Sequence, residues 1–163
     1  MFEKTGIQDP EKILEKFPSI ERINKGPVAI AECFAKIPCN PCETACAFSA
    51  ITIGADINNL PTVNFNNCTG CGVCLSKCPG LAIMVIDGSK SSKSIEMRLP
   101  YEFLPLPKIG DTVRGLDREG RFVCISAVKN VQNPKAFDRT PIITIEVPRE
   151  HMYTVRSFSL EDK

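Results

Sequence analysis

The first part of the chain has the hydrophobic spacing of a short helix followed by a short strand. A helical apolar face is formed by Ile13, Leu14 and Phe17. Asp9 and Pro10 precede this face, and a capping residue followed by proline is a favourable helix start. Pro18 predicts the end of the helix, and Val28 and Ile30 then alternate with alanines as in a strand. We expect this part of the chain to serve docking rather than chemistry.

The last part of the chain has the pattern of a β-rich domain. Its short apolar runs are separated by glycine and proline, which favour turns. The expected strands are Ile95–Leu99, Thr112–Leu116, Phe122–Val128, Pro141–Val147 and Met152–Phe158. The segment from Asp117 to Gly120 predicts a hairpin turn between the second and third strands. Short strands at this density are typical of a small barrel or sandwich.

The middle of the chain contains an internal repeat. Residues 46–51, with the sequence CAFSAI, align with residues 78–83, with the sequence CPGLAI. Each copy has a run of cysteines followed by a short apolar strand. Because neither half is large enough to bury a core by itself, the repeat predicts two related half-modules folded around inorganic clusters.

Size and charge exclude several classes of function. The chain has 163 residues, a formal net charge of +1, and neither a basic stripe nor an acidic tail, so we expect no nucleic-acid or membrane-surface binding. No apolar run reaches the roughly 18 residues of a membrane span, and residues 1–10 lack the features of a secretory signal. We therefore expect a cytoplasmic protein. In a reducing compartment, closely spaced cysteines are better read as metal ligands than as disulphides.

The cysteine-containing segment from residue 33 to residue 86 is nearly uncharged. Its only charged residues are Lys36, Glu43, Asp56 and Lys77. A freely diffusing protein that must find its partners usually presents a strong field of one sign, which steers it to them. The neutral composition instead favours a module packed against partner subunits in a hetero-oligomer.

Four cysteines in the second half of the repeat carry the strongest chemical signal. Cys68, Cys71, Cys74 and Cys78 have the spacing Cys-x2-Cys-x2-Cys-x3-Cys, and Pro79 follows them. This run is typical of [4Fe-4S] ligation, in which three thiolates surround one cubane and the fourth cysteine reaches a second cluster. Gly70 and Gly72 would permit close backbone approach and amide hydrogen bonds to sulphur.

The first half of the repeat ends in the same way but begins differently. Cys39, Cys42 and Cys46 keep the regular spacing, whereas Lys36 occupies the position of the first cysteine and Cys33 lies three residues earlier. An ammonium group is a poor ligand for iron. Either Cys33 supplies the missing thiolate through a bulged loop, which we favour, or this half holds an incomplete [3Fe-4S] cluster.

The crossed ligand pattern assigns the cysteines to two sets. Cluster one would be held by Cys33, Cys39, Cys42 and Cys78, and cluster two by Cys46, Cys68, Cys71 and Cys74. Structural zinc is the alternative for these residues. Zinc sites, however, usually combine two cysteine pairs separated by longer loops.

The remaining candidate residues predict no catalytic site. Cys124 lies in an apolar strand and is expected to be a small buried side chain. His151, the only histidine, is expected at a surface or interface. Arg114, Arg118 and Arg121 surround the expected hairpin and predict a solvated turn, with a docking patch as the alternative. We expect a subunit without an active site of its own.

Two resemblances add expectations about function. Residues 39–86 resemble the bacterial-type two-cluster ferredoxin domain, although Ala47 replaces the usual proline after the fourth cysteine. Residues 33–43, with the sequence CFAKIPCNPCE, resemble the ferredoxin-like subunits of FAD-dependent amino-acid dehydrogenases of the proline, hydroxyproline and sarcosine type in anaerobic microbes. That resemblance implies a partner flavoprotein, with FAD or FMN, that oxidises a C–N bond and passes its electrons to this chain.

Together these patterns predict an α+β protein, a ferredoxin-like two-cluster module followed by a small all-β barrel or sandwich-like domain. The expected parts are an N-terminal docking extension (1–32), a two-[4Fe-4S] ferredoxin-like domain (33–86), a linker rich in serine and lysine (87–94) and a small β-rich domain (95–163).

Three functions are compatible with this organisation. The first is an electron-transfer subunit of a flavin-dependent dehydrogenase that oxidises an amino acid or amine. The second is a stand-alone ferredoxin whose β-rich domain recognises several redox partners. The third uses the clusters as a folding staple or a redox sensor, and reversible one-electron reduction would distinguish an electron carrier from a purely structural role.

Overall fold

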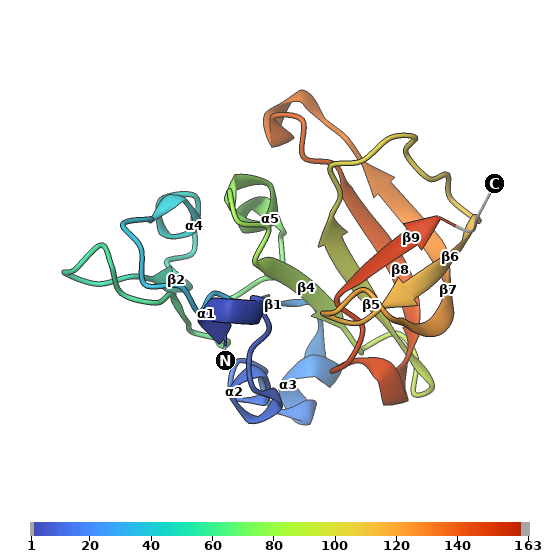
Figure 1. The fold of residues 1–163 in the computed structure, drawn as a ribbon, viewed down its shortest axis with the longest axis horizontal. Coiled ribbons are helices and arrows are strands. Elements are labelled where there is room, and N and C mark those ends of the chain that lie inside the picture. The colour runs from blue at the N-terminus through green and yellow to red at the C-terminus, as the bar shows by residue number, and fades with distance from the viewer. Residues whose placement is uncertain (1, 161–163) are drawn as a thin grey trace.

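Three short helices begin the part of the chain, residues 2–160, that the computed structural model describes (Figure 1). They are α1 (Phe2–Thr5), α2 (Pro10–Leu14) and α3 (Ile20–Lys25). The carboxylate of Asp9 accepts a hydrogen bond from the Glu11 N–H at 3.1 Å, and Pro10 occupies the first turn, so the predicted helix start is confirmed. Met1 and residues 161–163, at the outer ends of the expected extension and β-rich domain, lie outside the described residues.

A seven-stranded antiparallel sheet, in the order β1-β4-β5-β8-β7-β6-β9, forms the framework of the molecule. Its strands are β1 (Val28–Ala31), β4 (Ile83–Asp87), β5 (Ser94–Pro100), β6 (Thr112–Leu116), β7 (Phe122–Gln132), β8 (Ile142–Pro148) and β9 (Ser157–Leu160). The sheet therefore takes strands from the expected extension, from the cysteine-containing segment and from the β-rich segment.

The cysteine-containing segment forms a lobe beside this sheet (Figure 1). The lobe contains α4 (Pro41–Thr44), the hairpin of β2 (Ile51–Thr52) and β3 (Thr62–Val63), and α5 (Val73–Lys77). Two short 3-10 helices, η1 (Lys135–Phe137) and η2 (Arg149–His151), flank β8. None of the helices among the described residues is long and apolar enough to cross a membrane.

Strands β1 and β4 separate two hydrophobic cores. Successive side chains of a strand point to opposite faces, so each of these strands contributes to both cores. Val28 and Met84 pack into the core of the large sheet, whereas Ala29 and Val85 pack against the cysteine-containing lobe. Every residue of both strands is buried. The lobe and the large sheet consequently share a wall that neither can complete without the other.

The sheet curls so that strands far apart in its order approach each other. Tyr101, which follows β5, stacks on Phe158 of β9 with ring centroids 4.9 Å apart. Arg118, in the turn between β6 and β7, forms an ion pair with Glu32 at the end of β1. Side chains from the late strands therefore reach the segment in which the cysteine lobe begins.

Four of the five predicted strands occur where the sequence places them. β5, β6, β7 and β8 overlap the predictions, and the hairpin turn closes through a hydrogen bond from the Asp117 N–H to the Arg121 carbonyl at 2.9 Å. The fifth prediction, Met152–Phe158, is wrong over most of its length, because β9 begins only at Ser157. Met152 and Val155 are buried from a turn, so their apolar character reflects core packing without strand pairing.

Candidate metal centre

The cysteines expected to hold cluster one surround a common cavity. These residues are Cys33, Cys39, Cys42 and Cys78. Cys33 follows β1, Cys42 lies on α4, and Cys78 ends α5, so three separate elements bring the thiols together. The rest of the wall is apolar and includes Ile53 and Ile83. Such a lining excludes water from the space between the thiols.

The cysteines expected to hold cluster two surround a second cavity. These residues are Cys46, Cys68, Cys71 and Cys74. Cys74 lies on α5, and Gly72 precedes this helix as its N-cap with φ +87°, a conformation that glycine adopts without strain. Ala29 of β1 forms part of the wall, and its small side chain leaves room between the strand and the thiols.

Each cavity thus combines three cysteines of one half of the repeat with one cysteine of the other. This is the crossed grouping that the sequence predicts, and all eight predicted ligands take part in it. Among the described residues, no three His, Cys, Asp or Glu side chains form a ready-made site for a single metal ion. The thiols instead stand around a space between them. Ligation itself stays a prediction.

The displaced cysteine and the lysine at the regular position have different surroundings. Cys33 is partly buried and lines the cluster-one cavity, whereas Lys36 is exposed and does not line it. Residues 35–38 are all exposed, so the loop bulges outward between Cys33 and Cys39. The extra residues are therefore accommodated at the surface, and the thiol of Cys33 stays with its set.

Backbone amides donate hydrogen bonds to three of the sulphurs. The Ala50 N–H points to the Cys46 Sγ at 3.2 Å, and the Ala82 N–H points to the Cys78 Sγ at 3.4 Å. Cys68 accepts from the N–H groups of Ala29 and Gly70, at 3.3 and 3.4 Å. Such bonds stabilise negative charge on sulphur, as metal-bound thiolates require.

The internal repeat is reproduced in backbone detail. Ala50 and Ala82 each stand four residues after the cysteine to which they donate. The residues before them, Ser49 and Leu81, have φ values of 49° and 50°, a left-handed conformation that is uncommon outside glycine. This conformation turns the following N–H toward sulphur in both halves. The sequence gives no sign of it, because neither position is glycine.

Burial changes the acidity of the thiols. Burial, followed by the charges of Cys68, Cys71 and Cys46, raises the pKa of Cys74 to about 12. Burial and the charge of Cys78 raise the pKa of Cys42 to about 11. A raised pKa favours the protonated thiol, so binding of a positively charged iron centre to these residues would release their protons.

Arg22 of α3 fixes the loop that carries Cys68. Its guanidinium donates hydrogen bonds to the carbonyl oxygens of Phe65 and Cys68, both at 2.7 Å. It also donates to the carbonyls of Gly26 and Pro27, at 3.0 and 3.2 Å. A single side chain of the N-terminal segment therefore positions the cluster-two loop. Sequence reasoning missed this role, because an arginine on a short helix has no distinguishing pattern.

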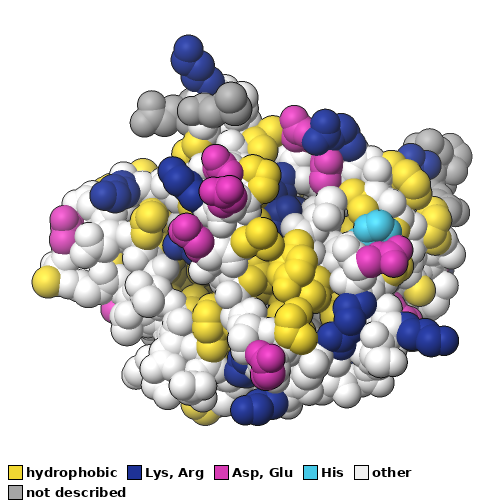
Figure 2. All heavy atoms as spheres, turned by 90° about the horizontal axis from the view of Figure 1, so that it is seen from below, with side chains coloured by type: hydrophobic (Ala, Val, Ile, Leu, Met, Phe, Trp, Pro, Cys, Tyr) yellow, Lys and Arg dark blue, Asp and Glu magenta, His cyan; other side chains and the backbone are white. Residues whose placement is uncertain are grey.

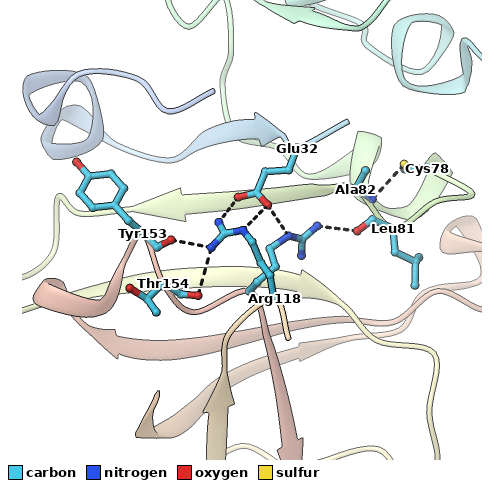
Figure 3. Close-up of polar contacts among 8 residues, drawn as sticks. Glu32, Cys78, Leu81, Ala82, Arg118, Tyr153 and Thr154 are labelled. Atoms are coloured by element: carbon cyan, nitrogen blue, oxygen red, sulfur yellow. Dashed lines mark hydrogen bonds and ion pairs between the residues drawn. The ribbon is translucent and has the colours of Figure 1, made fainter. Parts of the chain in front are cut away.

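A buried ion network lies beside the cluster-one loop (Figure 3). The Glu32 carboxylate accepts from Arg118 and, at 3.2 Å, from Nε of Arg156. The side chain of Glu32 is 5% exposed, and those of both arginines are 16% exposed. The expectation that Arg118 belongs to a solvated turn is therefore wrong. Its guanidinium leaves the turn to reach Glu32 and the carbonyls of residues 153 and 154.

The other two candidates stand apart from both cavities. Cys124 lies on β7, is buried, and has its sulphur 3.7 Å from the Ser126 hydroxyl. His151 lies in η2, partly exposed, with Nε2 3.4 Å from the Glu150 carboxylate. Neither residue lines either cysteine cavity.

An open cleft borders the cluster-one cavity. It has a volume of about 550 Å³, and Cys33, Ala35 and Ile37 line both the cleft and the cavity. Aromatic side chains, including Phe34 and Tyr101, form part of its lining. The first cysteine set is thus separated from the cleft by only one short segment of chain.

Comparisons with known proteins agree with this geometry in the second half of the repeat. Residues 61–84 match the family model of the 4Fe-4S binding domain. Over 54 residues the chain is 37% identical to the Ferredoxin-type protein NapF of Haemophilus influenzae. This match covers 32% of the chain and 31% of NapF, so the chain spans about a third of that relative. No solved structure matches the chain significantly. Residues 61–84 therefore resemble a 4Fe-4S binding domain, and they contain the cysteines of the regular run.

Proposed function

We propose that this chain is the electron-transfer subunit of a flavin-dependent dehydrogenase and relays electrons through two [4Fe-4S] clusters. The observation that carries the proposal is the crossed gathering of eight cysteines around two neighbouring cavities. When bound, each cluster would supply reversible one-electron chemistry. Two such centres built from one short repeat make a path for electrons.

The donor set suits iron and sulphide. Thiolates are soft ligands, and the walls of both cavities are largely apolar. The N–H groups of Ala50 and Ala82 are aimed at cysteine sulphur, which favours the negatively charged ligand. The raised pKa of Cys42 and of Cys74 would be offset by the positive charge of iron. The chain's own residues therefore favour a charged metal centre over empty thiols.

Each cysteine set has a route to the surface. Cys33 lines the open cleft next to cluster one, and Cys71 of the other set is exposed. Electrons would enter beside one of these residues and leave beside the other. The cleft is the better entry point, because its apolar and aromatic lining would exclude water from a docked donor.

Exposed apolar side chains support a place within a larger complex. In the loop after β5, Phe103 is 70% exposed and Leu104 is 87% exposed. Figure 2 shows a second gathering of hydrophobic side chains on the face seen from below, the side on which α2 and α3 lie in Figure 1. Apolar surface of this kind commonly marks protein contacts. A flavoprotein subunit in the cytoplasm would cover it.

Only the sequence of residues 33–43 supports the proposal that the partner flavoprotein oxidises an amino acid or amine. Their resemblance to subunits of amino-acid dehydrogenases suggests C–N bond oxidation by the flavoprotein. The alternative function is a stand-alone ferredoxin, which the resemblance to a ferredoxin-type protein also allows.

Metal analysis tests the electron-transfer function. The protein, prepared anaerobically, is expected to contain about eight iron and about eight sulphide per chain. EPR-monitored titration should show two centres that are each reduced by one electron and reoxidised without loss. Zinc in place of iron, or clusters that cannot be reduced reversibly, would contradict the proposal.

Co-purification tests the flavoprotein partner. The tagged chain, isolated from its own cells, should carry a flavoprotein in fixed stoichiometry. The double variant Phe103→Ser with Leu104→Ser should keep its iron but lose much of this partner, because it removes the most exposed apolar loop. Ile125→Ser, at a 51% exposed position of β7, is the matched control. A monodisperse chain without flavoprotein that donates electrons freely would favour the stand-alone ferredoxin.

A further inference from the structure

The peptide group between Leu81 and Ala82 connects an arginine to a cysteine sulphur (Figure 3). Nη2 of Arg156 donates a hydrogen bond to the Leu81 carbonyl at 2.7 Å. The N–H at the other end of the same peptide group, that of Ala82, donates to the Cys78 Sγ at 3.4 Å. Hydrogen bonds in series polarise one another, so a charged donor on the carbonyl strengthens the N–H as a donor.

The arginine is held in place by an incompletely neutralised ion network. Arg156 and Arg118 share one carboxylate, that of Glu32, so the group carries one net positive charge. The other groups to which Arg118 donates hydrogen bonds are neutral carbonyl oxygens, and the carboxylate of Asp117, which interacts with Arg118, is itself paired with Arg121. Because guanidinium groups stay protonated in proteins, this positive charge persists across the accessible pH range. It lies beside Cys78, which belongs to the cluster-one set.

We propose that Arg156 is a positioning residue that acts through the Leu81–Ala82 peptide on the Cys78 sulphur and raises the reduction potential of cluster one. The proposal rests on the proposed function, since it requires a cluster in this cavity. Reduction adds one negative charge to the cluster. A nearby positive charge and a stronger N–H···S hydrogen bond both stabilise that reduced state.

The first half of the repeat lacks this relay, the series of hydrogen bonds that links Arg156 to Cys78 in the second half. The Ala50 N–H donates to the Cys46 Sγ in the same geometry, at 3.2 Å. Among the hydrogen bonds of residues 2–160, however, none reaches the carbonyl of Ser49, the counterpart of Leu81. The relay therefore acts on one cluster of the two. Cluster two becomes an internal reference within the same molecule.

The β-rich part of the chain would therefore influence which of the two clusters has the more positive reduction potential. Arg156 stands directly before β9, and Arg118 stands in the turn after β6. Arg156 reaches the Leu81 carbonyl in the loop after Cys78, and Arg118 reaches Glu32, which both arginines share. With a raised potential, cluster one, beside the open cleft, would hold the electron for a larger share of the time.

The test is an anaerobic, EPR-monitored redox titration of the full-length protein with both clusters present. Arg156→Gln removes the charge and weakens the relay, so the midpoint of cluster one should become more negative while that of cluster two is unchanged. Arg149→Gln is the matched control. Arg149 is also a partly buried arginine that donates to carbonyl oxygens, those of Gly88 and Ser91, but away from the cysteine sets. It should move neither midpoint.

A second variant, expected to shift the midpoint of cluster one in the opposite direction, keeps the proposal testable if Arg156→Gln does not fold. Glu32→Gln increases the net positive charge of the network, so the midpoint of cluster one should become more positive. An unchanged cluster-one midpoint in either variant with intact clusters, or equal shifts of both clusters, would overturn the relay. A wild-type chain without reversible clusters would instead overturn the proposed function, so the two failures are distinguishable.

Discussion

At the scale of single residues, Cys33 is the position where sequence and structure complement each other. The spacing allows either a displaced ligand or an incomplete cluster, because a thiolate three residues out of register reaches the site only if the loop bulges. The exposed residues 35–38 supply that bulge, and Cys33 lines the same cavity as Cys39 and Cys42. The geometry therefore favours the displaced ligand.

Replacing Cys33 tests this assignment. Cys33→Ser should lower the iron content from about eight to about seven per chain, or to about four if cluster one is lost, because a serine hydroxyl is a poor ligand for iron. EPR should show a changed cluster one and an unchanged cluster two. Cys124→Ser is the control, since Cys124 lies outside both cavities, and it should keep its full iron content. Equal iron content in the Cys33→Ser protein would show that Cys33 is not a ligand.

Gly70 illustrates a second constraint at the residue scale. It has φ +64°, and a Cβ atom there would lie 2.4 Å from the Cβ of Pro27. Gly70→Ala should lower the free energy of unfolding by about 2 to 4 kcal/mol, because strain and overlap combine. Gly110→Ala isolates the strain alone. Gly110 has φ +93° and open space around its Cα, so about 1 kcal/mol is expected.

Urea denaturation of both glycine variants measures this difference. The midpoint of Gly70→Ala should fall well below that of Gly110→Ala at a similar slope. Equal losses in the two proteins would mean that the close approach to Pro27 has no energetic weight.

At the scale of elements, α3 acts as a brace for the loop of cluster two. Arg22 on this helix donates hydrogen bonds to the carbonyl oxygen of Gly26, just after the helix, and to that of Cys68 in the loop. Removing it leaves partly buried carbonyls without this donor and loosens the loop. The short helix thus acts at a distance in sequence from the cysteines that it positions.

Arg22→Gln should release cluster two faster than cluster one. When the holoprotein is treated with an iron chelator, the EPR signal of cluster two should decay about 10-fold faster than in the wild type, a typical effect of losing an outer contact of a metal site. Lys25→Gln changes an exposed residue of the same helix and should leave both decays unaltered. Parallel acceleration of both signals would indicate general destabilisation without a specific brace.

Strand prediction at the element scale succeeded where alternation and turns coincide. β6 has the bounds that the sequence predicts, and the turn between Asp117 and Gly120 closes as expected. The last strand was misplaced, because Met152 and Val155 are buried in a turn. An apolar residue reports burial, and only backbone pairing distinguishes a strand from an apolar turn.

At the scale of the whole molecule, the shared strands connect the cysteine lobe to the large sheet. β4 pairs with β1 on one side and with β5 on the other. The serine- and lysine-rich segment between β4 and β5 closes a hairpin within the sheet, with Ile86 opposite Met97. The buried network of Glu32, Arg118 and Arg156 adds a second connection between the same parts.

This continuity predicts a single cooperative unfolding transition. In urea, the loss of cluster absorbance and the loss of far-UV circular dichroism should coincide, because neither part keeps its core without β1 and β4. The comparison must be made anaerobically, so that cluster loss reports unfolding and not oxidation. Two separate transitions would show that the cysteine lobe and the large sheet fold independently.

Local sequence patterns were sufficient to predict the 4Fe-4S motif that the family match supports and the positions of most strands. Cysteine spacing is a local property, since a tight loop fixes which thiols face one another, and the second half of the repeat matches a 4Fe-4S binding domain. How the parts join is visible only in the folded structure. Pairing of β1 with β4, and the reach of Arg156 to the Leu81 carbonyl, depend on segments far apart in the chain. No local pattern encodes such contacts, because they arise only when the sheet curls and closes its core.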